Sequence, residues 1–204
     1  MASTHAAFPA LAEFREALLA ESFSSAFAFT PLSSYHMTIF EGVIDLVRKP
    51  DYWPSDLPFD APLGLCHRTF LEKLEQFDLG SDPTFRLRLA PREVDRALQP
   101  GAAIMLVPAD AQEETKLRTL RDRLSVLLKL RHPGHDRYKF HITQTYRLKP
   151  LNEAETQTYR QLRDRAMEQL EKASPVIALG PPHFTFFDDM FEFRSKLVLR
   201  NQNG

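Results

Sequence analysis

The sequence predicts an α+β fold in which two lobes form a single domain over residues 1–204. Helical and strand-like hydrophobic patterns are mixed in both halves of the chain, and no break in composition separates the halves. Hydrophobic residues make up 43% and charged residues 26% of the 204 residues, which is ordinary for a globular protein. A chain of this length forms a core without disulfides or a structural metal.

The first half of the chain combines two helices with short strands. Phe8, Leu11 and Phe14 recur at helical spacing, whereas FRLRLAP alternates strictly between apolar and polar residues, as a half-buried strand does. Thr69-Phe-Leu-Glu72 matches a capping box, which predicts that a helix begins at this point. The patterns predict helices over 8–20 and from Thr69 to about 79, and strands over 26–29, 34–42, 85–91 and 102–109.

The second half repeats this plan. Leu117, Leu120 and Leu124 place one apolar face on a helix, and Asn152 with Glu155 forms the cap of another. The patterns predict helices over 111–130 and after Asn152, and strands over 139–148, 176–179, 183–189 and 190–195.

Prolines recur at every fourth residue in RKPDYWPSDLPFDAP. Because proline removes a backbone donor and fixes φ, this stretch cannot form a helix or a central strand. We predict a long surface loop over residues 48–65 that borders the functional site and influences the choice of substrate.

Charge and residue usage exclude several classes of protein. The chain has 26 basic and 27 acidic residues, so it lacks the basic excess with which proteins bind long duplex nucleic acid. None of its 7 glycines lies in a phosphate-binding loop motif. The single cysteine, Cys66, indicates a reducing compartment. No apolar run approaches the about 18 residues of a membrane span, and no signal peptide is visible, so we expect a cytoplasmic protein without a membrane partner.

The pattern His-x-Thr occurs four times, against about 0.4 occurrences expected from composition alone. His67-Arg-Thr69 has a structural explanation, because Thr69 is a predicted helix N-cap. His183-Phe-Thr185 follows two prolines near the C-terminus, and we expect it to line a groove or to support the structure. The other two copies, His36-Met-Thr38 and His141-Ile-Thr143, lie within predicted strands.

Alternate residues of a strand share a face, so each of these two motifs displays its histidine and threonine together. If the polar faces of both strands line one groove, His36, Thr38, His141 and Thr143 converge on a small space. Two imidazoles with pKa near about 6.5 can divide the work of general base and general acid. Two threonine hydroxyls can donate hydrogen bonds to the non-bridging oxygens of a phosphate between them.

Two H-x-T motifs on strands about a hundred residues apart resemble the two-histidine (2H) phosphoesterase superfamily, which includes 2′,5′-RNA ligase-like proteins and cyclic nucleotide phosphodiesterases. SSYHMTIFEGV and FHIT resemble an uncharacterised branch of it, and the resemblance covers residues 8 to 195. It implies two pseudo-symmetric lobes, each an antiparallel-type sheet with helices on its outer face, around a central groove. The family fold usually opens with a strand ahead of its first helix, whereas this chain begins almost directly in a helix.

Carried over onto this sequence, the resemblance implies that His36 and His141 are catalytic and that Thr38 and Thr143 bind phosphate, without a metal or other cofactor. We therefore expect a metal-independent phosphodiesterase that acts on a 2′,3′-cyclic phosphate or a 2′–5′ linkage of a nucleotide or RNA end. One histidine activates water or a ribose hydroxyl and the other protonates the leaving oxygen. The sequence does not assign the two roles.

Other side chains are candidate substrate contacts. Lys139 and Arg147 share the strand parity of His141, and Phe40 shares that of His36. Phe40, and Trp53 in the proline-rich loop, are expected to be able to stack on a base. Arg121 is expected on the solvated face of its helix.

Two alternative functions remain open at this point. A non-catalytic module of the same fold would bind a nucleotide or RNA end without turnover. A metal-dependent hydrolase would use His132 and His135, with Asp136 and His141 nearby, although a Pro-Gly turn between two histidines is more typical of a surface loop than of a zinc site.

Overall fold

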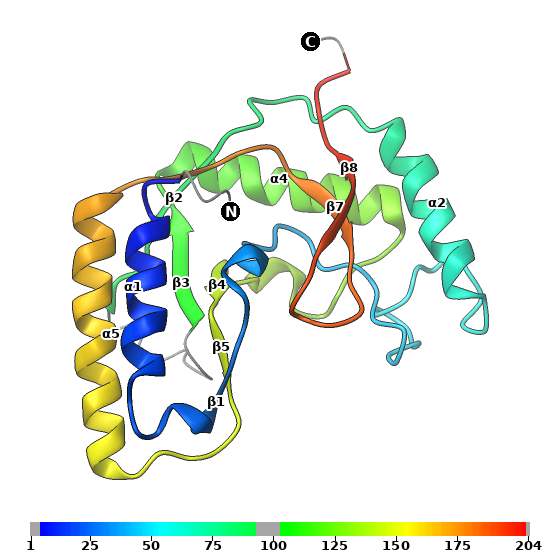
Figure 1. Ribbon diagram of the computed structural model, residues 1–204. Helices are drawn as coiled ribbons and strands as arrows, with labels where there is room; N and C mark the ends of the chain where they lie inside the picture. The colour runs from blue at the N-terminus through cyan, green and yellow to red at the C-terminus, as the bar shows by residue number, and fades with distance from the viewer. Residues whose placement is uncertain (1–4, 93–102, 203–204) are drawn as a thin grey trace.

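The computed structural model describes residues 5–92 and 103–202, and it confirms a mixed α+β fold (Figure 1). Its helices are α1 (Phe8–Leu19), α2 (Leu63–Glu75), α4 (Ala111–Leu128) and α5 (Glu153–Ala173), with short 3₁₀ turns η1 (Ser24–Ala26), η2 (Leu32–Ser34) and η3 (His135–Arg137). Its strands are β1 (Phe27–Phe29), β2 (Phe85–Leu89), β3 (Ala103–Pro108), β4 (His141–Thr143), β5 (Thr145–Arg147), β6 (Ile177–Leu179), β7 (His183–Phe186) and β8 (Arg194–Val198).

The central sheet has four antiparallel strands in the order β4-β3-β2-β6. Two further antiparallel pairs, β1 with β5 and β7 with β8, flank it. Helices α1 and α5 pack side by side, whereas α4 lies apart from them behind the sheet (Figure 1). The pseudo-twofold relation between two lobes stays a prediction.

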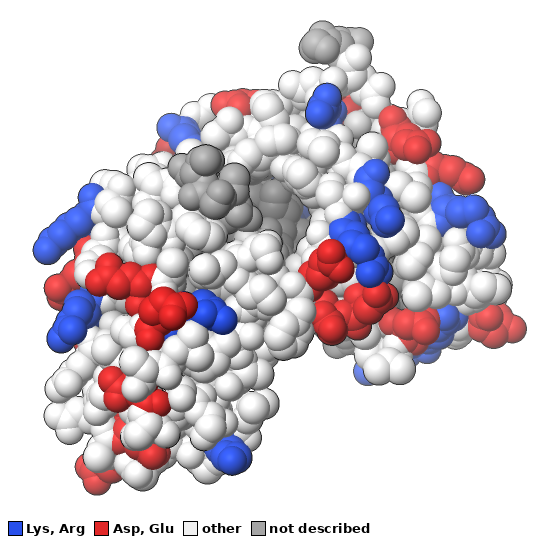
Figure 2. Space-filling model, in the orientation of Figure 1, with Lys and Arg blue, Asp and Glu red and all other residues white. Residues whose placement is uncertain are grey.

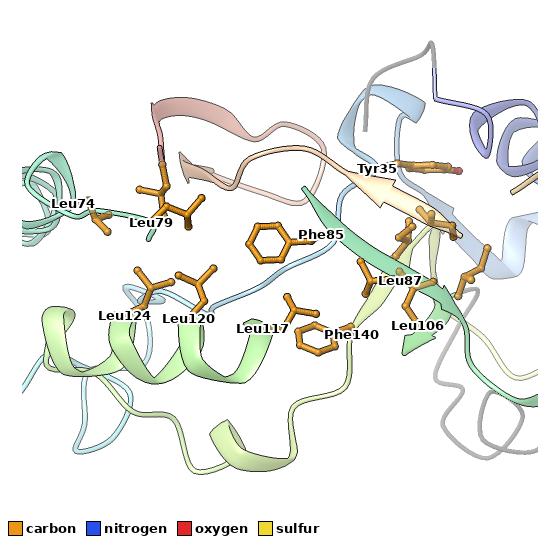
Figure 3. Packing of buried hydrophobic residues seen from close by; sticks show 14 of the residues in the cluster. Tyr35, Leu74, Leu79, Phe85, Leu87, Leu106, Leu117, Leu120, Leu124 and Phe140 are labelled. Carbon is orange, nitrogen blue, oxygen red and sulfur yellow. The ribbon is translucent and has the colours of Figure 1, made fainter. Parts of the chain in front are cut away.

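The main core lies between the sheet and α4. Phe85 and Leu87 of β2 are fully buried, and the strict alternation of FRLRL predicted this face correctly. Figure 3 shows Phe85, Leu117 and Phe140 pointing toward one another from β2, α4 and the segment before β4. A second cluster joins α1 to α5 through residues such as Leu18. No helix in residues 5–92 or 103–202 is long and apolar enough to cross a membrane.

The two strands predicted to carry the H-x-T motifs are shorter than expected. Residues 34–42 contain the end of η2, extended chain and one antiparallel bridge between Met37 and Ile142, rather than a continuous strand. The predicted strand 139–148 is divided at Gln144 into β4 and β5, which pair with different partners. The buried Gln144 side chain donates to the Leu11 carbonyl, and the main-chain carbonyl of Gln144 accepts from the amide and hydroxyl of Thr30.

Helix α2 begins six residues before the predicted N-cap. Pro62 occupies the N-cap position, and Thr69 lies inside the helix. The first-turn amides of a helix need no intrahelical partner, so a proline beside them costs little. The prediction of a cap at Thr69, and with it the structural explanation of the His67 motif, is therefore wrong.

The proline-rich loop is an extended surface segment, as expected, but Trp53 faces inward. Its side chain is 2% exposed, and its indole donates to the Pro58 carbonyl at 3.0 Å. The Arg48 guanidinium lies 4.2 Å from the ring centroid and donates to the Ala61 carbonyl. The expectation that Trp53 stacks on a base is therefore wrong, because the ring is already covered by its own loop.

Replacing this ring should destabilise the fold. We expect Trp53→Ala to lower the free energy of unfolding by about 3–5 kcal/mol, the usual cost of removing a buried large aromatic side chain. Urea denaturation followed by far-ultraviolet circular dichroism measures it. The matched control is Phe59→Ala, since Phe59 lies in the same loop and is 49% exposed. Equal, small losses for both variants would contradict a structural role for Trp53.

Candidate active site

The antiparallel bridge between Met37 and Ile142 brings the two H-x-T motifs side by side. In this register His36 lies opposite Thr143, and Thr38 lies opposite His141. The motifs are 105 residues apart in the sequence, and each one places its threonine beside the histidine of the other.

Side-chain burial shows which way the paired segments face. Tyr35 and Ile142 are fully buried and Gln144 is 1% exposed, so the odd-numbered positions of the first segment and the even-numbered positions of the second point into the core. Burial raises the pKa of the Tyr35 phenol to about 12. The histidines and threonines of both motifs alternate with these residues, and all four are half-buried on the opposite face.

The paired register fixes the approximate size of the site. Side chains directly opposite one another in an antiparallel pair have Cβ atoms about 4.5–5.5 Å apart, and diagonal neighbours lie at about 7–8 Å. The two histidines are diagonal neighbours, as are the two threonines. Hydroxyls and imidazoles thus alternate around the bridge, with each threonine opposite the histidine of the other motif.

Both histidines are oriented by the same local contact. Nδ1 of His36 lies 2.7 Å from the carbonyl oxygen of Ser34, and Nδ1 of His141 lies 2.9 Å from that of Lys139. A carbonyl oxygen only accepts, so Nδ1 carries the proton in each ring and Nε2 keeps its lone pair. Each motif therefore presents an Nε2 atom that can accept a proton and, once protonated, return it.

The two histidines have different surroundings. The ring of Phe193, from the segment between β7 and β8, packs against His36 with centroids 4.0 Å apart. Burial lowers the pKa of His36 below its ordinary value, the hydrogen bond to Ser34 opposes this, and the nearby His141 lowers it further. His36 therefore stays neutral to a lower pH than an ordinary imidazole does.

Each motif threonine has a tyrosine partner that the sequence analysis missed. Burial raises the pKa of Tyr138 to about 12, while its hydrogen bond with Thr38 acts in the opposite direction. Burial likewise raises the pKa of Tyr146, and a hydrogen bond with Thr143 opposes it. The phenols stay neutral near pH 7 and orient the threonine hydroxyls. The crossed pairing of Tyr138 with the distant Thr38 leaves no local signal in the sequence.

Arg121 supports this arrangement from inside the protein. It was expected on a solvated face, but its side chain is 1% exposed and donates to the carbonyls of Ile39 and His135. Its guanidinium lies 4.2 Å from the ring centroid of Tyr138. The buried cation thus connects the chain just after Thr38 to the residue that contacts Thr38.

The other predicted substrate contacts lie outside the four paired histidine and threonine positions. Lys139 is exposed, and its carbonyl orients His141. Arg147 is exposed on β5, beyond the break at Gln144, so its strand parity no longer relates it to His141. Phe40 is half-buried against the core, with its ring 6.0 Å from that of His135.

The other two H-x-T histidines lie in different contacts. His67 stacks on Phe186 with centroids 3.9 Å apart, and His183 is exposed with Nδ1 2.8 Å from the Ser195 hydroxyl. Neither belongs to the paired segments.

A group of potential metal ligands lies elsewhere. Ligand atoms of Asp122, His135 and Asp136 lie within 4.8 Å of one another beside a pocket of about 320 Å³. However, the Arg131 guanidinium binds Asp122 at 3.0 Å and Asp136 at 2.5 Å. His132 contacts the Gly42 carbonyl instead. The arrangement is that of an ion-pair network in which one guanidinium contacts both carboxylates.

Comparisons with known proteins bear on the family of the chain and on its fold. A family model named 2H-phosphodiest and described as a domain of unknown function (DUF1868) matches residues 1–97, which include His36 and Thr38. The chain is also similar to the crystal structure of a conserved protein of unknown function, ATU0111, from Agrobacterium tumefaciens str. C58. The two share 31% sequence identity with a TM-score of 0.86, over 97% of this chain and 82% of that one. No curated protein matches the chain.

The carbonyl contacts predict the tautomers of the histidines. In their neutral forms His36 and His141 should carry the proton on Nδ1, whereas His132, whose Nε2 lies 3.0 Å from the Gly42 carbonyl, should carry it on Nε2. Long-range ¹H–¹⁵N correlation spectra above pH 8 distinguish the two forms by nitrogen shift. Finding the Nε2–H tautomer at His36 or His141 would show that the site is oriented differently.

Proposed function

Because the chain belongs to the 2H phosphoesterase superfamily, we propose that it is a metal-independent phosphodiesterase for a 2′,3′-cyclic phosphate or a 2′–5′ linkage in a nucleotide or RNA end. The observation that carries the proposal is the bridge between Met37 and Ile142, which pairs the two H-x-T motifs on one face. The pairing supplies two proton-transfer groups and two hydroxyl donors in one place.

In this proposal the phosphate binds between Thr38 and Thr143. Each threonine hydroxyl then donates its O–H to a non-bridging phosphate oxygen. These donors stabilise the negative charge that grows on phosphorus-bound oxygens as the nucleophile adds.

His36 is the proposed general base and His141 the general acid. Nε2 of His36 removes a proton from water as the water oxygen bonds to phosphorus. The bond from phosphorus to the leaving ribose oxygen breaks, and that oxygen takes a proton from Nε2 of His141. Each Nδ1–H keeps its carbonyl partner throughout, so neither ring must rotate. In the reverse direction the two roles exchange.

A substrate panel tests the proposal. The purified protein is incubated in excess EDTA with 2′,3′-cyclic nucleotides and with 2′–5′ and 3′–5′ dinucleotides, and the products are analysed by chromatography. Turnover in EDTA supports the proposal. Tight binding without turnover would instead favour the non-catalytic module, and activity that depends on added metal would contradict the mechanism.

The two paired histidines should dominate turnover. We expect His36→Gln and His141→Gln each to lower kcat by about 10²–10⁴-fold, the usual worth of general acid–base catalysis. Thr38→Val and Thr143→Val should cost less, because proton transfer is retained. His183→Gln is the matched control, since His183 carries the same motif outside the pair. The choice of pair is wrong if His183→Gln abolishes activity and His36→Gln preserves it.

The acid limb of the pH profile tests the assignment of the base. A general base must be neutral, and burial lowers the pKa of His36 below the ordinary imidazole value. Activity should therefore persist as the pH falls through about 6.5, the ordinary value, and should decline only at lower pH. Measurement of kcat/KM from pH 4 to 9 checks this. An acid limb centred above the ordinary value would contradict His36 as the base.

A further inference from the structure

The segment between β7 and β8, residues 187–193, forms an aromatic wall beside His36. Phe193 packs against the His36 ring at a centroid distance of 4.0 Å, and Phe187 packs against Phe193 at 5.3 Å. The aromatic surface thus continues outward from the imidazole proposed to act on the phosphate. We refer to residues 187–193 as the hairpin tip.

The base of the hairpin is held firmly against α2. Phe186 stacks on His67 with centroids 3.9 Å apart, and Phe184 packs at 6.2 Å from Phe70. The buried Leu199 follows β8, and its amide donates to the Pro182 carbonyl. These contacts fix the direction of the hairpin, so the tip is presented to His36 by a packed element.

The hairpin tip exposes apolar side chains to solvent. Phe187 is 39%, Met190 37% and Phe191 51% exposed. Clustered exposed aromatic side chains on a globular protein usually mark a binding surface. Within the tip, Phe187 is continuous with the ring stack on His36 through Phe193, so a group bound there lies next to a phosphate held between the paired motifs.

We propose that the hairpin tip is the subsite for the planar, uncharged group of the substrate, a nucleobase, which stacks on Phe187 and Phe191 while the phosphodiester lies between the paired motifs. This proposal rests on the proposed function. Stacking on exposed rings selects a flat group of any base type, because every base has a π-face. It therefore predicts little discrimination among the four bases.

The charge of the hairpin tip adds a second element of specificity. Acidic side chains gather on the face of the molecule that carries this hairpin (Figure 2). Asp188, Asp189 and Glu192 lie in the tip, and Arg194 pairs with Asp188 at 2.7 Å and approaches Glu192 at 3.9 Å. Because residues 187–193 contain three acidic side chains and no basic one, a further phosphate beside the base would be repelled. The subsite thus fits a nucleoside with one phosphodiester better than the end of a longer strand.

Two cyclic phosphates separate base binding from catalysis. The double variant Phe187→Ala, Phe191→Ala is compared with Phe59→Ala, which removes a similarly exposed ring from the proline-rich loop. With 2′,3′-cyclic AMP, we expect the hairpin variant to raise KM at least tenfold and to change kcat little. With glycerol 1,2-cyclic phosphate, which has no base, both variants should match the parent protein. Equal losses on both substrates, or no loss on either, would overturn the proposal.

Adenosine tests the subsite without any chemistry on phosphorus. Titration of the parent protein with adenosine, followed by ¹H–¹⁵N spectra, should shift amide signals of residues 183–198, and the double variant should bind at least tenfold more weakly. This result would stand even if no cyclic phosphate were hydrolysed. Absence of adenosine binding to the parent protein would overturn the subsite, even if the phosphodiesterase activity were confirmed.

The charge element has its own test. Glu192→Gln keeps the shape of the tip, and Glu192 is exposed. Relative to 2′,3′-cyclic AMP, the variant should improve kcat/KM for 5′-phosphorylated 2′,3′-cyclic AMP about threefold or more at low salt, and the gain should shrink at high salt. An equal change for both substrates at every salt concentration would contradict repulsion by the tip.

Discussion

The paired register of Met37 and Ile142 is the constraint on which the candidate site depends. A shift of one residue in either segment would turn its histidine and threonine into the core and its apolar residues outward. The buried face resists such a shift, because Tyr35 and Ile142 are fully enclosed and Gln144, opposite Tyr35, is 1% exposed. Hydrophobic burial on one face thus sets the chemistry on the other.

Local patterns predicted the regular elements well and the contacts between them poorly. The spacing of Leu117 and Leu124 and the capping box at Asn152 specify α4 and α5 through interactions within a few residues, and both helices are observed. The segment over 34–42 has the pattern of a strand but only one bridge, because the adjoining chain turns away after Met37. A strand forms only where a second strand lies alongside it, and the alternation of apolar and polar residues does not specify that second strand.

The site itself was predictable only in part. The H-x-T spacing indicated which residues share a face, but the burial of Arg121 depends on carbonyls of Ile39 and His135, which lie on other elements. The contact between His36 and Phe193 likewise joins distant parts of the chain. Trp53 was predicted to be exposed because it lies in a loop, but the loop folds over the aromatic ring and buries it. Each of these features depends on tertiary packing, which periodicity does not encode.

His36 and His141 share a motif and a carbonyl contact but have different aromatic neighbours, since Phe193 packs 4.0 Å from the His36 ring and Tyr138 lies 6.2 Å from the His141 ring. Nδ1 is held alike in His36 and His141, so their local geometry does not distinguish a base from an acid. Phe193 contributes to the burial that lowers the pKa of His36, and it comes from the C-terminal hairpin rather than from either motif. The same hairpin carries the exposed rings of Phe187 and Phe191. One added element can therefore give a nearly symmetric pair of motifs both a direction for proton transfer and a side on which the substrate's base is bound.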